Sequence, residues 1–307
     1  LLHTTVQEVR RLATAGATLD HRDGGILQVC STAAGLQALR READEWGHWG
    51  VRTEVLDSAA LHAAEPLLTT AAIGAVRLVD DACFDPALLL AAVTEEGHRH
   101  GVVSYDARAA RIEPRGDRSA RVHTSMGVLD VTNVVVAAGV WTPTLCRPLG
   151  ARLPIASARG NSVTLPDAPK PNSPMLLHEQ RLALSPLTQG LRVTGGYRLT
   201  RHEDRAVSSP RSHEIVRRAG QVLDLPVGTQ PSNEWTGLRP ATPDGLPIVG
   251  ALPNAPCVLV ASGHGMLGSS SGPGTGEVVA ALLAGDELPF DPTVVAPGRF
   301  ARKGSGR

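Results

Sequence analysis

The order of apolar and polar positions divides the first third of the chain into alternating helices and strands. Apolar residues recur three to four positions apart in the helical segments, whereas short continuous apolar runs mark the strands. Helix caps are expected at Ser31 or Thr32, at Asp57 or Ser58, and at Asp85, and Pro86 suits a first helical position. The helices are expected at residues 1–13, 33–46, 58–65 and 86–100, and the strands at residues 24–29, 51–56, 73–79 and 101–105. Such alternation predicts an α/β fold.

Strand patterns dominate the next part of the chain. Val134–Ala138 is an uninterrupted apolar run that ends in Gly139, which is typical of a fully buried parallel strand. Residues 153–197 contain apolar runs separated by turns, and a helical pattern follows at about 212–223. This second pattern predicts an antiparallel sheet with one helix.

The change of pattern divides the chain into parts. Residues 1–150 and 226–298 are expected to form one α/β unit, with an antiparallel-sheet domain at 151–225 inserted between them. The strands at Val134 and Val258 are therefore expected to share a sheet. The last residues, 299–307, are expected to be a disordered tail.

Composition excludes several classes of protein. With 307 residues, 42% of them apolar and 20% charged, the chain is long enough for a large core. Its net charge of zero, without a basic stripe, argues against a nucleic-acid partner. The four cysteines are far apart in apolar surroundings, which predicts buried reduced thiols, no metal site and a cytoplasmic location. No apolar run approaches the ~18 residues of a membrane span.

The stretch Glu234–Gly285 has the most informative pattern. A proline-rich turn carrying Arg239 precedes an apolar strand at Cys257–Ala261, a loop with six glycines at Ser262–Gly276, and a helix at Glu277–Leu283. A glycine loop before a helix start presents bare backbone N–H groups and partial positive charge, which suits an anion or a group that becomes anionic. The alternative is a long surface connection without a ligand.

Two motifs carry a resemblance to a known family. The run G-L-R-P-A-T-P-D-G-L-P-I-V-G, followed by a strand and G-H-G-M-L-G, resembles the C-terminal part of FAD-dependent D-amino-acid dehydrogenases and oxidases. This family includes glycine oxidase, sarcosine oxidase and D-amino-acid oxidase relatives. The run V-V-A-A-G-V-W at Val135–Trp141 is similar to the family's second nucleotide-domain motif. The resemblance implies an FAD-binding Rossmann-like domain, incomplete in this chain, and an antiparallel-sheet substrate domain.

The resemblance also implies which residues contact FAD. Ala109 matches a strand whose backbone meets the adenine, although the family usually has valine there. His264 has an alternative reading as a structural residue, because the chemistry does not require a base at that position. The implied cofactor residues are Ala109, Ala138, Gly139, Trp141, Leu238, Gly263, His264, Gly265, Met266, Leu267 and Gly268.

Arg239 is the residue expected to bind the substrate, since it matches the family's arginine that pairs with the amino-acid carboxylate. A planar guanidinium suits a bidentate carboxylate contact. Tyr197 lies where family members place active-site side chains, although it is also a candidate for an ordinary sheet tyrosine. Met266 stands where the glycine-oxidase branch can have an arginine, which favours the dehydrogenase branch.

The chain departs from the family in one respect. The family's N-terminal G-x-G-x-x-G motif after a first strand is not present near Leu1, which predicts an N-terminally truncated chain that binds FAD poorly by itself. The implied activity is oxidation of a small D-amino acid, or a glycine-like amine, to the imino acid by hydride transfer to flavin N5. Water would then release the 2-oxo acid.

Three points stay open at this stage. The electron acceptor is a quinone or O₂, and peripheral association with a membrane is a further possibility. The oligomeric state is not indicated by any pattern. The alternative function is a non-catalytic fragment or pseudo-enzyme that keeps the fold without FAD.

Overall fold

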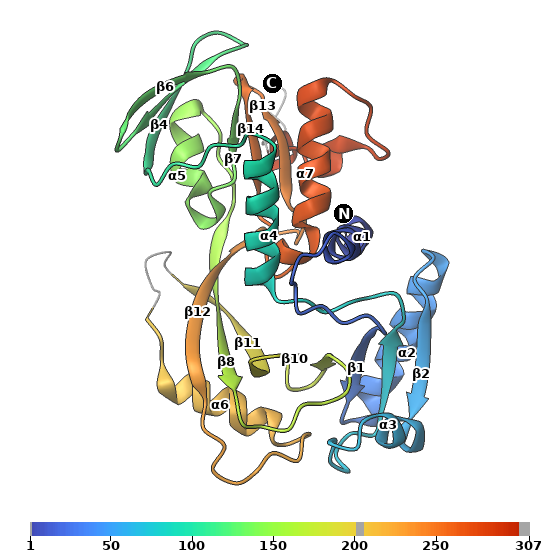
Figure 1. The fold of residues 1–307 in the computed structure, drawn as a ribbon. Coiled ribbons are helices and arrows are strands. Elements are labelled where there is room, and N and C mark those ends of the chain that lie inside the picture. Colours follow the sequence, from blue (N-terminus) through green and yellow to red (C-terminus); the bar gives the residue numbers. More distant parts are fainter. Residues whose placement is uncertain (1, 201–205, 301–307) are drawn as a thin grey trace, which may run out of the picture.

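The computed structural model describes residues 2–200 and 206–300, which build a lower and an upper part joined at a narrower waist (Figure 1). The lower part contains an eight-stranded sheet with strand order β12-β8-β11-β10-β9-β1-β3-β2. Its strands are β12 (Ser232–Ala241), β8 (Ala156–Leu165), β11 (Gly190–Thr200), β10 (Leu182–Leu187), β9 (Met175–Leu177), β1 (Ile26–Cys30), β3 (Gly74–Leu78) and β2 (Thr53–Asp57).

The upper part contains two three-stranded sheets. The first has the order β13 (Ile248–Leu252), β14 (Ala255–Ser262) and β7 (Val134–Val136), and the second is the antiparallel sheet β4 (Ala109–Pro114), β5 (Ala120–Thr124) and β6 (Gly127–Val131). In the first sheet β7 and β14 run parallel, with Val134 opposite Val258. The expectation that these two distant apolar runs share a sheet is confirmed.

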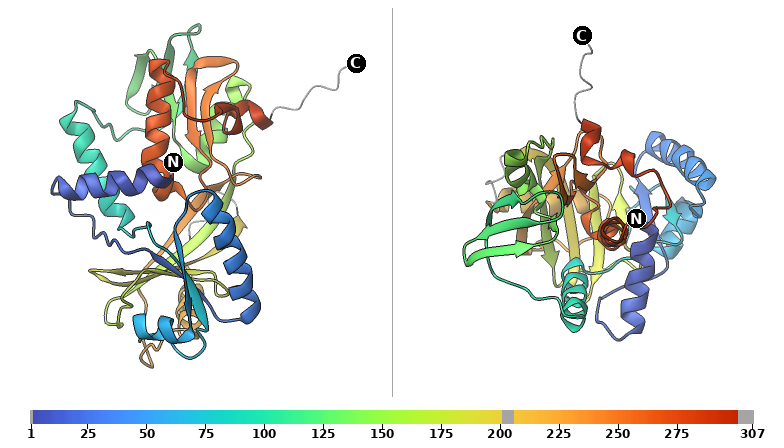
Figure 2. Two further views of the ribbon diagram at one scale, coloured as in Figure 1. Left: turned by 90° about the vertical axis from the view of Figure 1, so that its right-hand side faces the viewer. Right: turned by 90° about the horizontal axis from the view of Figure 1, so that it is seen from above.

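Helices cover the sheets on several sides. In the upper part α7 (Gly268–Ala284) packs against α1 (Leu2–Thr14), and the short helix α5 (Thr142–Cys146) follows β7 (Figures 1 and 2). The helix α4 (Pro86–Arg99) stands at the waist (Figure 1). In the lower part α2 (Ala33–His48) and α3 (Ser58–Ala64) pack on β1 to β3, and α6 (Ser209–Ala219) packs on β8 and β11.

The helix starts follow from their capping residues. Thr32 accepts a hydrogen bond from the Gly35 amide, as Asp57 does from Ala60 and Asp85 from Ala87. Each side chain satisfies a donor that the first helical turn leaves without a partner. The three predicted helix starts are confirmed.

The strands at residues 26–78 differ from the expected division of the chain. β1 pairs in parallel with β9, so that Leu27 lies opposite Met175, and β3 and β2 extend the same sheet. These strands therefore belong with β8 to β11 rather than with β7 and β14. Their pattern of apolar residues fits either sheet, since such a pattern predicts a strand but does not determine which strand pairs with it. The division at residues 150 and 225 stays a prediction.

Three local expectations are wrong. Residues 101–105 form no strand, and Val102 and Val103 are 57% and 67% exposed, because no described strand lies beside them to complete a ladder. β7 is an outer strand of its sheet rather than fully buried, with Val135 40% exposed. Arg299 is ordered, since its guanidinium donates to the Asp244 carboxylate over 2.8 and 3.2 Å. Residues 301–307 of the expected tail lie outside the described residues.

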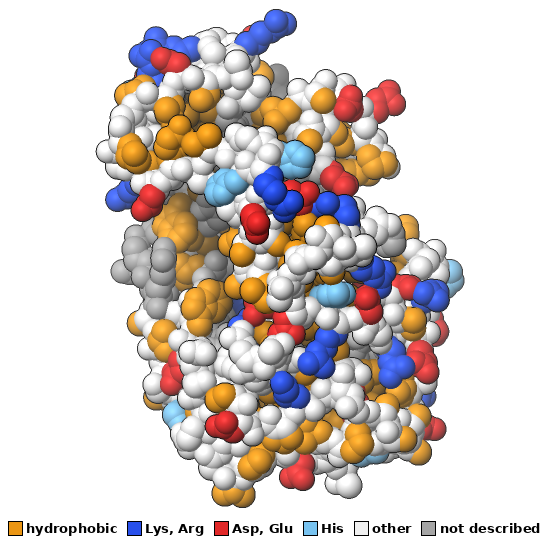
Figure 3. Space-filling model, in the orientation of Figure 1, with side chains coloured by type: hydrophobic (Ala, Val, Ile, Leu, Met, Phe, Trp, Pro, Cys, Tyr) orange, Lys and Arg blue, Asp and Glu red, His pale blue; other side chains and the backbone are white. Residues whose placement is uncertain are grey.

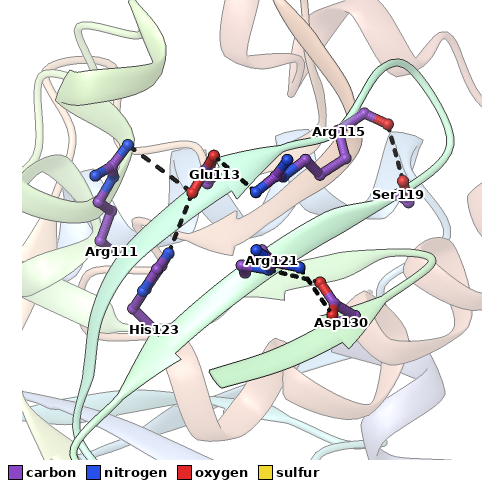
Figure 4. Close-up of polar contacts among 7 residues, drawn as sticks. All are labelled: Arg111, Glu113, Arg115, Ser119, Arg121, His123 and Asp130. Atoms are coloured by element: carbon purple, nitrogen blue, oxygen red, sulfur yellow. Dashed lines mark hydrogen bonds and ion pairs between the residues drawn. The ribbon is translucent and has the colours of Figure 1, made fainter. Parts of the chain in front are cut away.

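Charged residues on the sheet β4–β6 are paired with one another (Figure 4). The Glu113 carboxylate lies 3.2 Å from Arg115 and 3.2 Å from the His123 imidazole, and Arg121 donates to Asp130 over 2.8 and 3.1 Å. The hydrogen bond from His123, reinforced by the neighbouring arginines, holds the pKa of Glu113 below its ordinary value. The charged side chains on this face of the sheet therefore compensate one another.

All four cysteine side chains are buried and form no disulfide with one another, which confirms their expected role as small apolar residues. Among residues 2–200 and 206–300, no helix combines the length and the apolar composition needed to cross a bilayer.

Candidate active site

The glycine loop after β14 lies against the end of β12. The Gly265 amide donates to the Pro240 carbonyl over 2.9 Å, immediately beyond Arg239 in the chain. Gly263 has φ +83°, and a Cβ at this position would meet the Thr242 methyl group at 2.8 Å. Only glycine fits both this conformation and this space. The loop 263–268 is therefore held beside the end of the strand that carries Arg239.

The carboxyl ends of β7 and β14 are joined by a chain of hydrogen bonds. Thr142 Oγ1 donates to Ser262 Oγ over 3.1 Å, and Ser262 Oγ donates to the Gly139 carbonyl over 3.1 Å. Gly139 has φ +54°, and the turn Gly139–Trp141 contacts β12. Ligands of open α/β sheets bind at the carboxyl ends of the strands. The structure thus brings Ala138, Gly139 and Trp141 to the same edge as the glycine loop.

The helix after the loop begins earlier than expected. α7 starts at Gly268, so the segment 268–276 is helical and Glu277 lies in the third turn instead of the first. The glycines, serines and Pro273 have low helix propensity, which is why the segment looks like a loop in the sequence. The helix nevertheless packs against α1 and buries Ser271, Gly274 and Thr275, and this tertiary packing outweighs the propensity. Gly265–Gly268, rather than residues 274–277, therefore forms the approach to the helix N-terminus.

His264 links the loop to the helix. Its Nε2 lies 2.9 Å from Thr275 Oγ1, and burial lowers the pKa of the imidazole. A neutral histidine bonded to a threonine favours the structural reading of this residue. Met266 and Leu267, which follow in the loop, are 68% and 51% exposed.

Arg239 is a partly buried cation without a carboxylate partner among the described residues. Its Nη1 donates to the Gly196 carbonyl over 2.8 Å, and its guanidinium lies over Gly160, where any Cβ would overlap it. Desolvation lowers the pKa of the guanidinium, and Tyr197 opposes this shift. A positive charge removed from water is costly unless an anion compensates it. The side chain is therefore prepared for an anionic ligand.

The other predicted residues lie at varying distances from this centre. Tyr197, 50% exposed, follows Gly196 at an irregularity in β11 and is close enough to affect Arg239. Leu238 neighbours Arg239 on β12, where alternate residues face opposite sides of the sheet. Ala109 opens β4 in a different sheet, and the structure does not bring it together with Arg239.

A cavity of about 1250 Å³ lies between the face of the large sheet, α4 and the first turns of α7. Figure 3 shows hydrophobic side chains gathered at the waist between the upper and lower parts. Gly268, Gly272 and Gly276 line the cavity from α7, and Trp235 lines it from β12. The sequence interpretation missed Trp235. The signal that could have found it is its alternation with Gly237 and Arg239 on one strand face.

The residues at this edge fit the ring end of a flavin. Gly263 and Gly265 both have positive φ, and no side chain caps the N-terminus of α7. Bare N–H groups and the helix dipole suit a ring that gains negative charge on reduction. The spacing Gly263-x-Gly265-x-x-Gly268 also follows a strand and opens a helix, although among the described residues no strand follows α7 to complete a βαβ unit. The described residues outside this loop show no second glycine loop of that kind.

Comparison with known sequences gives a consistent picture. The profile of the family described as "FAD dependent oxidoreductase" matches residues 1–282. A D-amino acid dehydrogenase from Methylobacterium radiotolerans is 33% identical over 294 residues, which cover 93% of this chain and 70% of the relative. A D-amino acid dehydrogenase from Cereibacter sphaeroides is 35% identical over 309 residues, covering 94% of this chain and 69% of the relative. The chain thus spans about 70% of the length of these relatives.

Solved structures share the fold. Glycine oxidase from Geobacillus kaustophilus superposes with a TM-score of 0.87 at 22% identity, covering 96% of this chain and 81% of that protein. L-amino acid deaminase from Proteus vulgaris superposes with a TM-score of 0.85 at 18% identity, covering 97% and 83%. At these identities the similarity concerns the fold alone.

Proposed function

The chain belongs to the FAD-dependent oxidoreductase family of enzymes, and from this premise we propose that it takes part in oxidising a small D-amino acid to the corresponding imino acid. Water then converts the imino acid to the 2-oxo acid and ammonia. The observation that carries the proposal is the desolvated guanidinium of Arg239, which has no carboxylate partner among the described residues and is held beside the glycine loop. Identities of 33% and 35% to D-amino acid dehydrogenases support the D configuration.

The protein's part in this reaction is to bind and orient the substrate. Arg239 pairs with the α-carboxylate, which replaces the water that burial removed from the guanidinium. Its hydrogen bond to the Gly196 carbonyl fixes the orientation of the guanidinium, whose two terminal nitrogens form a fork. Tyr197 stands next to this carbonyl and can contact the same carboxylate. With the carboxylate held, the Cα–H bond keeps one orientation, and orientation accounts for a large share of catalysis.

When bound, FAD would supply the two-electron oxidant that accepts a hydride from the substrate Cα. The residues that would hold its ring are the loop 263–268, the first turn of α7, and Ala138, Gly139 and Trp141 at the end of β7. Quinone and O₂ remain the two proposed final acceptors. A reducing compartment such as the cytoplasm is proposed, because four buried free cysteines favour it.

The test is chemical. The purified chain with excess FAD and a dye acceptor is offered D-alanine, L-alanine and glycine, and the 2-oxo acid is measured as its hydrazone. Formation of the 2-oxo acid from the D enantiomer alone supports the proposal. Formation from L-alanine alone shows that the assigned configuration is wrong. No product from any of the three, with the protein folded, supports the alternative of a non-catalytic chain.

A further inference from the structure

Trp235 presents an exposed indole to the cavity beside Arg239. It lies on β12, four residues before Arg239, and is 62% exposed. Tryptophan is a large apolar side chain, and one exposed in a concave site marks a surface for binding. The strand as a whole is not exposed at this point, because the next residue, Thr236, is 8% exposed and hydrogen-bonded to the Gly160 carbonyl.

Two glycines place the indole and the guanidinium side by side. Gly237 and Gly160 lie directly opposite each other on β12 and β8. A Cβ added to Gly237 would overlap the ring of Trp235, and a Cβ added to Gly160 would overlap the guanidinium of Arg239. Opposite residues in a sheet are roughly 5 Å apart, so the two groups lie on neighbouring glycines of one sheet face. A ligand bound to the guanidinium would therefore also contact the indole.

The cavity continues beyond Trp235. Leu90 and Val93 line it from α4, and Ser162 and Thr194 line it from the sheet, whereas Arg239 is outside this lining. A carboxylate on Arg239 thus sits at the margin of the cavity, with Trp235 between the charge and the apolar wall of α4. Arg192 lines the cavity near this wall, and its guanidinium lies 3.4 Å from the Asp85 carboxylate. The other charged lining residues, Glu8 and Glu277, are acidic, so a second substrate carboxylate would find no free cation in this lining.

On this geometry, and resting on the proposed function, we infer that Trp235 is a specificity-determining residue. The substrate's side chain packs across its indole while the α-carboxylate is held by Arg239. The favoured substrates are D-amino acids with apolar or aromatic side chains, and glycine and D-aspartate are poor ones. An aromatic side chain gains from the stacking geometry as well as from the buried area.

The experiment measures binding and turnover of D-phenylalanine and D-alanine in the chain supplied with excess FAD. Trp235→Ala is expected to weaken D-phenylalanine binding in calorimetry by roughly tenfold or more, and D-alanine binding by less than about threefold. Trp235→Phe keeps most of the preference. Gly237→Ala leaves the indole in the protein but displaces it, so it lowers D-phenylalanine binding in the same direction. Trp49→Ala, which removes an 86% exposed tryptophan outside the cavity, is the matched control.

Each outcome separates the inference from the proposed function. An equal loss for both amino acids, or no loss for either, overturns the role of Trp235 while the D-amino-acid function stands. Weaker FAD binding in Trp235→Ala, with an unchanged preference between the two amino acids, assigns the ring to the flavin and also overturns it. If the unsubstituted protein binds neither amino acid, the proposed function fails, and the inference fails with it.

Discussion

Arg239 on β12 and the arginines of the β4–β6 sheet are surrounded in opposite ways. Arg121 and Arg115 lie at the surface and contact carboxylates, Asp130 and Glu113 respectively (Figure 4). Arg239 is partly buried, bonded to a carbonyl, and meets no carboxylate among the described residues. Carboxylates compensate the charges of the exposed arginines, whereas no carboxylate of the described residues compensates the partly buried Arg239.

Under the proposed function, the difference separates charges that are compensated within the fold from a charge that is compensated by a ligand. Exposed ion pairs contribute little to stability, because water and salt already screen them. Removing the Arg239 guanidinium from water without a compensating carboxylate opposes folding. An arginine kept at this position beside the glycine loop therefore needs a functional reason. The substrate carboxylate of the proposed function would provide that reason. Substitutions at Arg239, Gly160, His264 and His123 can break or sharpen this contrast.

Removal of the lone charge should have the largest effect. Arg239→Ala is expected to lose about 2–5 kcal/mol of transition-state binding for D-amino acids, because both the charge and the fork geometry disappear. Arg239→Lys restores charge without the fork and should recover only part of it. The measurement is kcat/KM for D-alanine, with Arg121→Ala as the matched surface control. Equal effects of Arg239→Ala and Arg121→Ala would remove the distinction between the two regions.

Displacing the charge without removing it should have the next largest effect. Gly160→Ala places a methyl group where the guanidinium now lies, so the fork must shift. A displacement of ~1 Å in a positioning group can reduce the rate roughly 100-fold. Gly47→Ala is the control, because nothing lies within 4 Å of a Cβ there. An unchanged kcat/KM in Gly160→Ala would show that the position of the guanidinium is not critical.

The pH dependence of stability should report His264. Burial lowers the pKa of the folded imidazole, so the unfolded chain binds the proton more readily. The stability that this group contributes is present above its unfolded pKa of about 6.5 and is lost as the pH falls toward the lower folded value. Urea unfolding at pH 7.5, 6.5 and 5.5 should therefore show a shallower loss in His264→Gln than in the parent. Parallel pH profiles for the two proteins would contradict this role.

The smallest effect is expected on the charged sheet. His123→Ala removes the hydrogen bond that lowers the pKa of Glu113, so this pKa should rise toward its ordinary value in a carbon-detected NMR titration. Amino-acid binding should stay the same. A loss of substrate affinity in this variant would mean that the two regions are coupled after all.

The sequence predicts the ends of β7 and β14 well, because the signals there are local. Gly139 and Gly263 each end an apolar run, and the positive φ that each needs is available to glycine without strain. The apolar runs at Val134 and Val258 share the character of buried strands, and they do pair. The caps Thr32, Asp57 and Asp85 also act within three residues of their own position.

What the sequence could not predict depends on contacts distant along the chain. The helical state of residues 268–276 depends on tertiary packing, which buries Ser271, Gly274 and Thr275 and overrides poor propensity. The pairing of β1 with β9 joins residues about 150 positions apart, and the alternation in either strand fits other partners. Trp235 has an ordinary strand position, and only the two glycines beneath it and Arg239 make it part of the site.

The most direct test of the account compares an amino acid with its amide. D-phenylalanine and D-phenylalaninamide differ in the carboxylate alone, so their affinity ratio measures how strongly the site selects that charge. We predict that the chain with excess FAD prefers the acid by roughly 100-fold or more, and that Arg239→Ala reduces this preference to near unity. A preference for the acid that survives in Arg239→Ala would place the carboxylate elsewhere and contradict the account.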